Sequence, residues 1–390
     1  DFIPTIERLM ALPERPDHIL IETSGLALPK PLLKAFDWPA IRSRITVDGV
    51  IALADAEAVA AGRFAPDPAA VAAQRTKKLK FLMLGNLVPL HNPLRIAEEL
   101  AMADTMSRGR ILSGFARGVP REYNVYGVPM AESRARFEEA VDIILKAWTE
   151  SKFSYEGKYW SYKDIAIWPR PYTQPHPPVW VPFTGSKETI GWAGRHNFSA
   201  VIPDHHRGLT QDIVGYYAKQ LAAHGNKITP EHMCFFTDAY VAKDRETAIK
   251  EYSPFYLYFV HTLWHHGSLE KASQAKGTGY LSSSSMDYIR PENRVGVGVD
   301  REGMQKTTMA DIERKISAGE LSWGSPKEVA DNLIAGAERM GANSLLINMN
   351  VGAMAHDVFM EQIRRFGRDV LPRLQAHQVK RVPAAEAVPA

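Results

Sequence analysis

Runs of apolar residues alternating with polar ones predict a strand, a helix and a second strand early in the chain. The apolar runs Phe81–Val88 and Ile111–Phe115 each have the length and composition of a buried strand. Between them, the stretch from Pro93 to about Ser107 predicts an amphipathic helix, with Asn92 as its N-cap and the proline in its first turn. This βαβ unit is typical of parallel sheets and barrels.

Four more apolar runs predict strands at Val179–Phe183, Ser199–Ile202, Phe235–Ala242 and Ser344–Met349. Between the first pair and these, residues 120–126 are expected to form a loop and residues 130–151 a long helix. Four apolar positions three or four residues apart should face the sheet: Phe137, Val141, Ile144 and Trp148. Residues 151–178 predict a β-rich excursion with six aromatic residues between positions 153 and 168, for which packing of a small hairpin is favoured over stacking of a ligand.

The first 75 residues predict two more strands, Ile19–Thr23 and Val50–Ala54, separated by a helix. Six strands and two make eight, the number that closes a (β/α)₈ barrel. One hypothesis is that these two strands complete such a TIM barrel. The alternative is a separate appendage beside an open barrel, and the two readings stay equally open.

Composition limits the classes of partner. The chain has 47 Lys and Arg against 44 Asp and Glu, so no nucleic-acid footprint is expected. The single Cys234 excludes an internal disulfide and a Cys-rich metal site, which fits a reducing cytoplasm. No apolar run reaches the roughly 18 residues that span a bilayer, so no membrane partner is expected.

Three motifs in order, GNLVPLHNPLRIAEELAMAD, SRGRILSGFARG and YGVPMAESRARFEE, resemble the luciferase-like flavin-dependent monooxygenases, and the resemblance covers about residues 76–374. That family implies a TIM barrel that binds reduced FMN and uses O₂ to oxygenate a small organic substrate, often with a partner flavin reductase. Some relatives bind the deazaflavin F420 instead, and the motifs do not separate the two cofactors. A homo-oligomer is left open.

Residues 1–75 resemble an internal fragment of CobW-type GTPases, in the stretch Glu22-Thr23-Ser24-Gly25-Leu26-Ala27 and the strand after it. A phosphate loop, an Asn-Lys-x-Asp motif and a Cys-x-Cys-Cys motif do not occur in the sequence. A GTP-binding metallochaperone is therefore the least favoured function. The expected domains are this incomplete fragment at 1–75, a flavin-binding barrel at 76–376 and a flexible tail at 377–390.

The turn Thr184-Gly185-Ser186, followed by a helix from Lys187, carries the cofactor argument. Free N–H groups and the positive end of the dipole at a helix N-terminus suit a phosphate. From the residues alone, Ser186 could equally be an ordinary N-cap. The resemblance implies that this turn, with Thr189 and Arg117, holds the flavin phosphate. Many relatives carry Glu where this chain has glycine, which allows a closer approach of the backbone.

The family resemblance also places a non-proline cis peptide behind the isoalloxazine ring, at Gly85–Asn86. Its Glu-His-His motif belongs to a strand that this chain lacks, so the catalytic residues are unknown. Glu22 or Asp55 would stand at the replacement strand ends. Among the histidines, none is singled out for catalysis: His91, His205, His206, His261, His265 and His266. No metal site is expected, since adjacent histidines do not converge on one ion.

Two further segments follow from the resemblance. The Gly- and Ser-rich residues 264–314 lie where the family carries a mobile segment over the flavin. Asn348, Asn350 and Gly352, after the last strand, are expected near the substrate mouth or, alternatively, as caps of the strand end. The sequence thus predicts a flavin-dependent monooxygenase, with an F420-dependent oxidoreductase or a catalytically impaired fusion protein as alternatives.

Overall fold

The computed structural model describes residues 11, 76–183, 185–203, 207–261, 284, 287–290, 306–351 and 354–383. The chain divides into two compact units, residues 1–66 and 67–390. The two strands expected at Ile19–Thr23 and Val50–Ala54 lie outside the described residues, and so do Glu22 and Asp55. The fold described below is that of the second unit.

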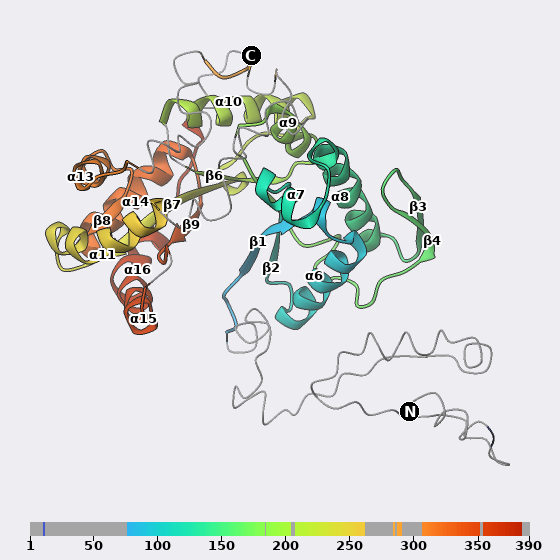
Figure 1. Ribbon diagram of the computed structural model, residues 1–390, viewed down its shortest axis with the longest axis horizontal. Coiled ribbons are helices and arrows are strands. Elements are labelled where there is room, and N and C mark those ends of the chain that lie inside the picture. Colours follow the sequence, from blue (N-terminus) through green and yellow to red (C-terminus); the bar gives the residue numbers. More distant parts are fainter. Residues whose placement is uncertain are drawn as a thin grey trace. The chain divides into compact units, whose positions relative to one another are not determined.

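The second unit contains a parallel sheet in which all six predicted strands are found (Figure 1). Its strands are β1 (Phe81–Leu87), β2 (Ile111–Ala116), β5 (Val179–Pro182), β6 (Ser199–Pro203), β7 (Met233–Val241), β8 (Ser322–Gly324) and β9 (Ser344–Asn348). The order is β1-β2-β5-β6-β7-β8, with β9 also pairing with β7. The short β8 was not predicted, because three residues are too few to show an alternating pattern.

The two faces of this sheet are both apolar, as expected for parallel strands. Alternate residues of six strands form a small cluster on one face: Leu82, Leu84, Leu112, Trp180, Val201, Cys234, Phe236 and Leu346. Their neighbours in sequence pack on the other face against the helices, as Val179 and Val181 do. The sheet is therefore a half-barrel, with helices outside and an apolar inner face. In the described part of the chain no ladder joins β9 to β1, so closure by eight strands is not established.

The helices on the outer face begin where the sequence places caps. Helix α6 (Pro93–Ser107) starts at Asn92, whose Oδ1 accepts hydrogen bonds from the N–H groups of Leu94 and Arg95. Helix α14 (Pro326–Met340) starts at the capping box of Ser325 and Glu328. In α8 (Ser133–Thr149) all four apolar positions predicted to face the sheet are buried. These local predictions are confirmed.

The remaining elements complete the unit. They are α7 (Pro120–Tyr126), α9 (Lys187–Arg195), α10 (Arg207–Ala223), α11 (Arg245–His261), α13 (Met309–Ser317), α15 (His356–Arg365), a π-helical turn η8 (Phe366–Val370) and α16 (Leu371–Gln375), with short 3₁₀ turns η1 (Val88–Leu90), η2 (Met130–Glu132) and η3 (Pro230–His232). The loop expected at residues 120–126 is wrong. This stretch is α7, because Pro120 starts it and the Glu122 carboxylate accepts the N–H of Val119.

Two predicted peripheral segments are ordered. The excursion after α8 forms a hairpin of β3 (Phe153–Glu156) and β4 (Ser161–Ile165), and several of its aromatic rings pack on the core. The tail expected to be flexible from residue 377 is instead packed over its first half, where Val379 and Val382 are buried and the Val379 N–H donates to Asn343. Residues 384–390 lie outside the described part.

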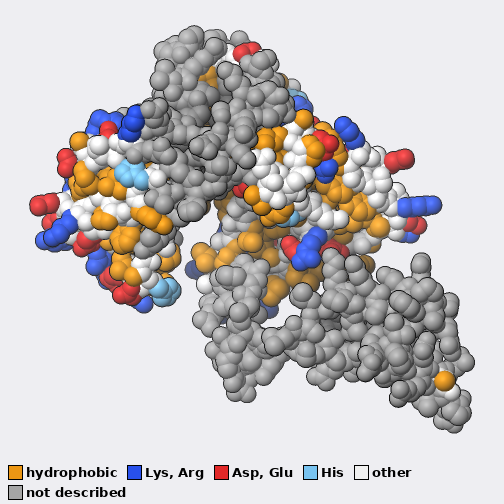
Figure 2. All heavy atoms as spheres, viewed as in Figure 1, with side chains coloured by type: hydrophobic (Ala, Val, Ile, Leu, Met, Phe, Trp, Pro, Cys, Tyr) orange, Lys and Arg blue, Asp and Glu red, His pale blue; other side chains and the backbone are white. Residues whose placement is uncertain are grey.

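The described surface mixes charges of both signs. On the face shown in Figure 2, Lys and Arg side chains stand among Asp and Glu side chains. In the described residues, no helix combines the length and the hydropathy needed to cross a bilayer.

Candidate functional site

The carboxyl ends of three adjacent strands bring the predicted cofactor residues to one edge of the sheet. Strand β1 pairs in parallel with β2, and β2 with β5. Parallel strands end at the same edge, so Asn86 near the end of β1 lies at the edge where Arg117 and Gly185 follow the ends of β2 and β5. This edge is where ligands bind in α/β folds of this kind.

A residue that the sequence analysis missed, Arg134, forms the centre of the site. From the first turn of α8, its Nη2 donates to Ser186 Oγ at 3.1 Å and to Thr189 Oγ1 at 2.8 Å. These are the two hydroxyls that the sequence singled out on the α9 turn. Arg134 lies in the stretch YGVPMAESRARFEE that carries the family resemblance. No rule of local spacing connects a residue of α8 with two residues of α9, so the sequence did not show this contact.

The ordinary reading of Ser186 as an N-cap is not supported. Ser186 occupies the N-cap position of α9, yet its side chain makes no capping hydrogen bond. Its hydroxyl instead donates to Glu188 Oε2 at 2.8 Å and accepts from Arg134. The Ser186 side chain therefore caps none of the N–H groups in the first turn of α9. A helix N-terminus of this kind is suited to an anion.

Arg117 lies next to this cluster. Its Nη1 donates to Ser133 Oγ at 3.2 Å, and Ser133 immediately precedes Arg134. The Tyr123 hydroxyl of α7 donates to the Arg117 carbonyl and holds the backbone there. The Arg117 side chain therefore reaches the start of α8, one residue from Arg134, and both residues carry guanidinium groups. Such groups offer the planar fork of N–H donors that phosphate oxygens accept.

The backbone around Gly185 explains why glycine stands there. Gly185 has φ +115°, a conformation that L side chains rarely adopt. Its carbonyl accepts a hydrogen bond from the Tyr288 hydroxyl at 2.8 Å. The neighbouring Thr184, also predicted to contact the cofactor, lies outside the described residues.

The cis peptide expected at Gly85–Asn86 is wrong. The cis bonds in the described residues precede Pro169 and Pro175. Strand β1 is instead irregular between Met83 and Asn86, where Gly85 takes φ +107°. The Asn86 side-chain amide donates to the carbonyls of Met83, at 2.8 Å, and Gly114, at 3.0 Å, so it bridges β1 and β2.

Asp238 of β7 places a carboxyl group on the inner face of the half-barrel, toward the carboxyl end of that strand. Strand alternation places it on the same face as Cys234 and Phe236, and its register partner on β9 is Asn348. Its Oδ1 is shielded from solvent and has no hydrogen-bond partner in the described structure. Burial raises the pKa of Asp238 to about 6, while Asn348 and Lys315 act in the opposite direction. Sequence reasoning missed it, because a lone Asp in a strand carries no motif.

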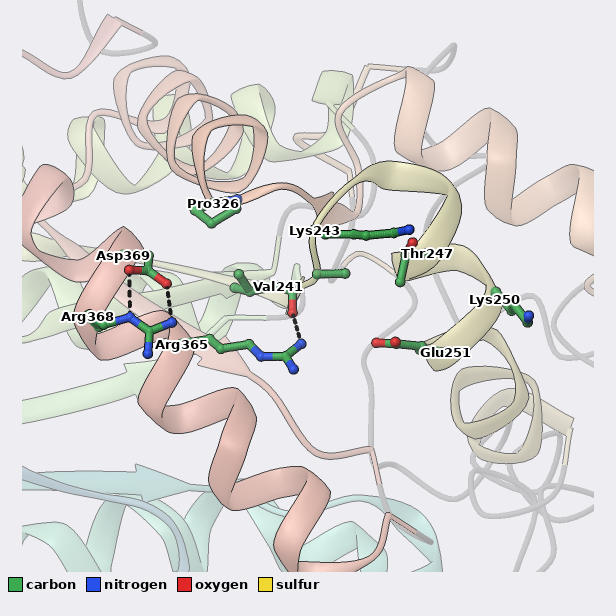
Figure 3. A pocket seen from close by; sticks show the side chains of 10 residues that line it. Val241, Lys243, Thr247, Lys250, Glu251, Pro326, Arg365, Arg368 and Asp369 are labelled. Atoms are coloured by element: carbon green, nitrogen blue, oxygen red, sulfur yellow. Dashed lines mark hydrogen bonds and ion pairs between the residues drawn. The ribbon is translucent and has the colours of Figure 1, made fainter.

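A separate cavity of about 620 Å³ lies at the carboxyl end of β7 (Figure 3). Its lining comes from the end of β7 and from α11, α14, α15 and η8, and here Arg365 of α15 donates to the Val241 carbonyl and Arg368 pairs with Asp369. None of the predicted cofactor residues lines it. It is therefore distinct from the site around Arg134.

Of the six histidines considered from the sequence, the structure describes two. His91 is exposed and packs edge-on against Tyr126, and a ring nitrogen of His261 contacts the carbonyl of Thr307. The pairs His205-His206 and His265-His266 lie outside the described residues. Within the described ranges no three His, Cys, Asp or Glu side chains could share a metal ion.

Of the residues expected near the substrate mouth, the structure describes two. Asn348 ends β9 opposite Asp238, and Asn350 follows that strand end. Gly352 lies outside the described residues, as does most of the segment 264–314.

Comparison with known proteins decides the family. Residues 49–344 match the family described as luciferase-like monooxygenase. The chain belongs to this family. Residues 1–89 match the CobW/HypB/UreG nucleotide-binding domain. Both resemblances read from the sequence are confirmed.

Two relatives of this luciferase-like chain correspond to its two resemblances. A zinc chaperone CobW of a Sinorhizobium species is 61% identical over 77 residues, which are 20% of this chain and 22% of the chaperone. The oxygenase component of the flavin-dependent trigonelline monooxygenase of Acinetobacter baylyi is 27% identical over 206 residues, covering 50% of this chain and 56% of that protein. The matched residues thus span about a fifth of the length of the chaperone and about half of the length of the oxygenase component.

Solved structures support the fold. The oxygenating constituent of 3,6-diketocamphane monooxygenase of Pseudomonas putida, in complex with FMN, superposes with a TM-score of 0.60 at 18% identity, over 80% of this chain and 84% of that one. The coenzyme F420 dependent tetrahydromethanopterin reductase of Methanopyrus kandleri gives 0.54 at 17% identity, over 78% and 86%. Both share the luciferase-like fold with this chain.

Proposed function

We propose that this chain is a flavin-dependent monooxygenase that holds the phosphate of FMN between Arg134, Ser186 and Thr189. The observation that carries the proposal is the pair of hydrogen bonds from Arg134 to the two hydroxyls at the start of α9. All three groups can donate to phosphate oxygens, and the start of α9 adds the positive end of the helix dipole. Arg117, beside Ser133, supplies a second cation.

The donor set fits a phosphate with one adjustment. The Glu188 carboxylate accepts from Ser186 and stands where an anion would compete with it. A phosphate would take over the Ser186 hydroxyl, and the Glu188 side chain would turn to solvent, since it is only partly buried. The positive N-terminus of α9 favours either negative group, but a phosphate also gains the guanidinium.

The inner face of the half-barrel would hold the ring system. Reduced FMN supplies the electrons that activate O₂ for insertion into an organic substrate. The chain's own part is to bind the ring on the apolar face around Leu84, Trp180 and Phe236 and to keep water out. Asp238 can hold a proton at its shielded Oδ1 near the ends of β7 and β9. A small substrate, O₂ and a flavin reductase would be its partners.

Closure of the barrel by the strands at Ile19–Thr23 and Val50–Ala54 belongs to this proposal. The half-barrel leaves the outer edge of β1 without a described partner, and open edges of this kind are normally paired or covered. Hydrogen–deuterium exchange of the full chain tests it. Strong protection of the amides in both segments supports closure, and exchange at the rate of an unstructured peptide in both contradicts it.

Titration of the purified chain with FMN, riboflavin and GTP, followed by flavin absorbance and calorimetry, tests the cofactor. We expect saturable binding of FMN, weaker binding of riboflavin and none of GTP. Equal affinity for FMN and riboflavin would contradict the phosphate site. A parallel titration with F420 decides the alternative of an F420-dependent oxidoreductase, which the shared fold favours equally.

A catalytically impaired fusion protein would differ from both enzymes in one measurement. It would bind the flavin but consume neither O₂ nor a hydride donor when the cofactor is reduced. O₂ uptake with chemically reduced FMN, across a panel of small ketones and aromatic acids, separates this outcome from turnover.

A further inference from the structure

The cavity at the carboxyl end of β7 lies between two helices that bring opposite charges to it. Figure 3 shows Glu251 of α11 and Arg365 of α15 extending toward each other from opposite sides, with Val241 between them. No ion pair joins the two groups in the described structure. The cavity volume of about 620 Å³ lies within the roughly 300–1,000 Å³ of small-molecule sites. The two charges therefore face a space that a small ligand can fill.

Glu251 is held in position by a buried tyrosine. The Tyr240 hydroxyl donates to Glu251 Oε2 at 3.1 Å. The Tyr240 ring stacks on the Tyr252 ring, with centroids 4.6 Å apart, and both rings are buried. Glu251 Oε1 makes no hydrogen bond in the described part of the chain. One carboxylate oxygen is thus fixed by the protein, and the other is left to accept from a ligand.

Arg365 is held in a similar way on the other side. Its Nε donates to Glu361 Oε1 at 3.0 Å, and its Nη1 donates to the Val241 carbonyl at 3.4 Å. The Gln362 side chain, on the same helix, bonds both backbone groups of Val241 and fastens α15 to the end of β7. Among the described residues no acceptor contacts Arg365 Nη2. Its N–H groups can therefore donate to an anion.

Both charges act on the same hydroxyl group, which shows that they lie near each other. Burial raises the pKa of Tyr240 to about 12; the Glu251 carboxylate raises it further, and Arg365 acts in the opposite direction. Coulomb interactions weaken with distance, so Glu251 and Arg365 both lie close to this hydroxyl. The two groups are neighbours that do not pair.

The remaining charges of the lining are occupied or turned away. Arg368 Nε and Nη2 donate to the two oxygens of Asp369 at 2.9 and 2.8 Å, so these two charges cancel. Lys243 lies 3.8 Å from the Asp244 carboxylate. The Lys250 side chain points away from the space in front of Val241 (Figure 3). One carboxylate and one guanidinium thus remain to face a ligand.

We propose that this cavity binds a small zwitterion, an α-amino acid with an apolar side chain, whose carboxylate contacts Arg365 and whose ammonium group contacts Glu251. Val241, Ala242 and Pro326 supply the apolar part of the lining. A carboxylate matches the planar fork of a guanidinium, and an ammonium group matches the free oxygen of Glu251. The site is separate from the one around Arg134 and goes beyond the proposed flavin chemistry.

Three matched compounds test the charge pattern by calorimetry on the full chain without flavin. Leucine carries both charges, 4-methylpentanoate lacks the ammonium group, and 3-methylbutylamine lacks the carboxylate. We expect saturable binding of leucine and at least roughly 10-fold weaker binding of the other two, because each loses one charge-assisted contact. Absence of saturable leucine binding, or equal affinity for leucine and 4-methylpentanoate, overturns the proposal.

The variant Glu251→Gln separates the two contacts. It removes the charge that attracts the ammonium group, and the amide oxygen can still accept from Tyr240. We expect the Kd for leucine to rise roughly 10-fold and the Kd for 4-methylpentanoate to stay equal or fall. Glu246→Gln, an exposed carboxylate of the same helix that does not line the cavity, is the matched control and should change neither Kd. An equal rise for both compounds in Glu251→Gln means that Glu251 has only a structural role and overturns the assignment.

Arg365→Gln tests the carboxylate contact, and Arg364→Gln on the same helix is its control. The Kd for leucine and for 4-methylpentanoate should both rise roughly 10-fold in Arg365→Gln. Because Arg365 also contacts Val241, thermal unfolding first establishes that this variant is folded; if it is not, Glu251→Gln alone decides. Unchanged affinities in folded Arg365→Gln overturn the proposal.

Hydrogen–deuterium exchange locates the bound leucine. We expect leucine to slow exchange in the peptides that contain residues 241–251 and 361–370, and to leave the start of α9 unchanged. Protection at the start of α9 without protection of these two peptides means that leucine binds elsewhere, and it overturns the site.

Discussion

Arg134 and Thr189 are joined by a hydrogen bond of 2.8 Å from Nη2 to Oγ1, although 55 residues separate them along the chain. This contact places a guanidinium over the start of α9, and it converts a turn with two hydroxyls into a site with a positive charge. The predictions below start from it.

Replacing Arg134 should weaken FMN binding through its phosphate. Hydrogen bonds to charged groups contribute about 1.5–3 kcal/mol, so Arg134→Ala should raise the Kd for FMN by roughly 10- to 100-fold. Arg134→Lys should recover part of the affinity, because it restores the charge without the planar fork. Flavin fluorescence titration measures both variants. The riboflavin Kd serves as the control, and an equal rise in it would show that the fold, not the phosphate contact, was damaged.

Neutralising Glu188 should act in the opposite direction. Its carboxylate accepts the hydrogen bond that the Ser186 hydroxyl donates, and its negative charge would repel a phosphate at the same helix end. Glu188→Gln should therefore tighten FMN binding about 3- to 10-fold at low ionic strength, an effect that salt reduces. Calorimetry at two salt concentrations tests it, with Glu150→Gln on exposed surface as the control. Weaker binding in Glu188→Gln would contradict the competing role.

Asp238 should make the free energy of unfolding depend on pH. Burial raises its pKa from 3.8 to about 6, so the folded state binds its proton more tightly than the unfolded state does. The stabilisation is complete below about pH 4 and is lost as the pH rises through 6, by up to about 3 kcal/mol. Asp238→Asn should remove this fall and be the more stable form at pH 7.

Urea unfolding of the wild type and of Asp238→Asn between about pH 4 and 8 measures the difference. Charged and titratable groups near Asp238, namely Lys315, Tyr252 and Tyr256, remain in both proteins and cancel in the comparison. Parallel curves with no change in slope near pH 6 would mean that Asp238 titrates normally.

Gln362 should be important for stability. Its buried side chain bonds both backbone groups of Val241, accepting from the N–H at 2.9 Å and donating to the carbonyl at 3.1 Å. Gln362→Leu leaves two buried backbone groups without this partner and should cost about 2–4 kcal/mol. Thermal unfolding tests it, with the exposed Arg364→Ala of the same helix as the control. A loss below about 0.5 kcal/mol would indicate that water replaces the amide.

Much of the fold could be read from the sequence because its signals are local. Asn92 and Pro93 start α6, and Ser325 starts α14, since capping depends on residues within one turn. The apolar spacing in α8 predicted that helix, and the apolar runs predicted the strands, for the same reason. The errors arose where a local rule competed with another. The α7 stretch was expected to be a loop, and Gly85 was expected to adjoin a cis bond instead of forming a bulge.

Six of the seven strands of the sheet, the starts of α6 and α14, the family and the turn before α9 could be predicted from the amino-acid sequence. Each of these depends on neighbours in the chain or on ordered motifs. The side chains that converge on that turn became known from the three-dimensional packing. Arg134, Glu188 and Tyr288 reach it from α8, α9 and the segment near residue 288, and Asp238 owes its raised pKa to burial between elements. Convergence and burial depend on how distant elements pack, and no spacing along the chain encodes them.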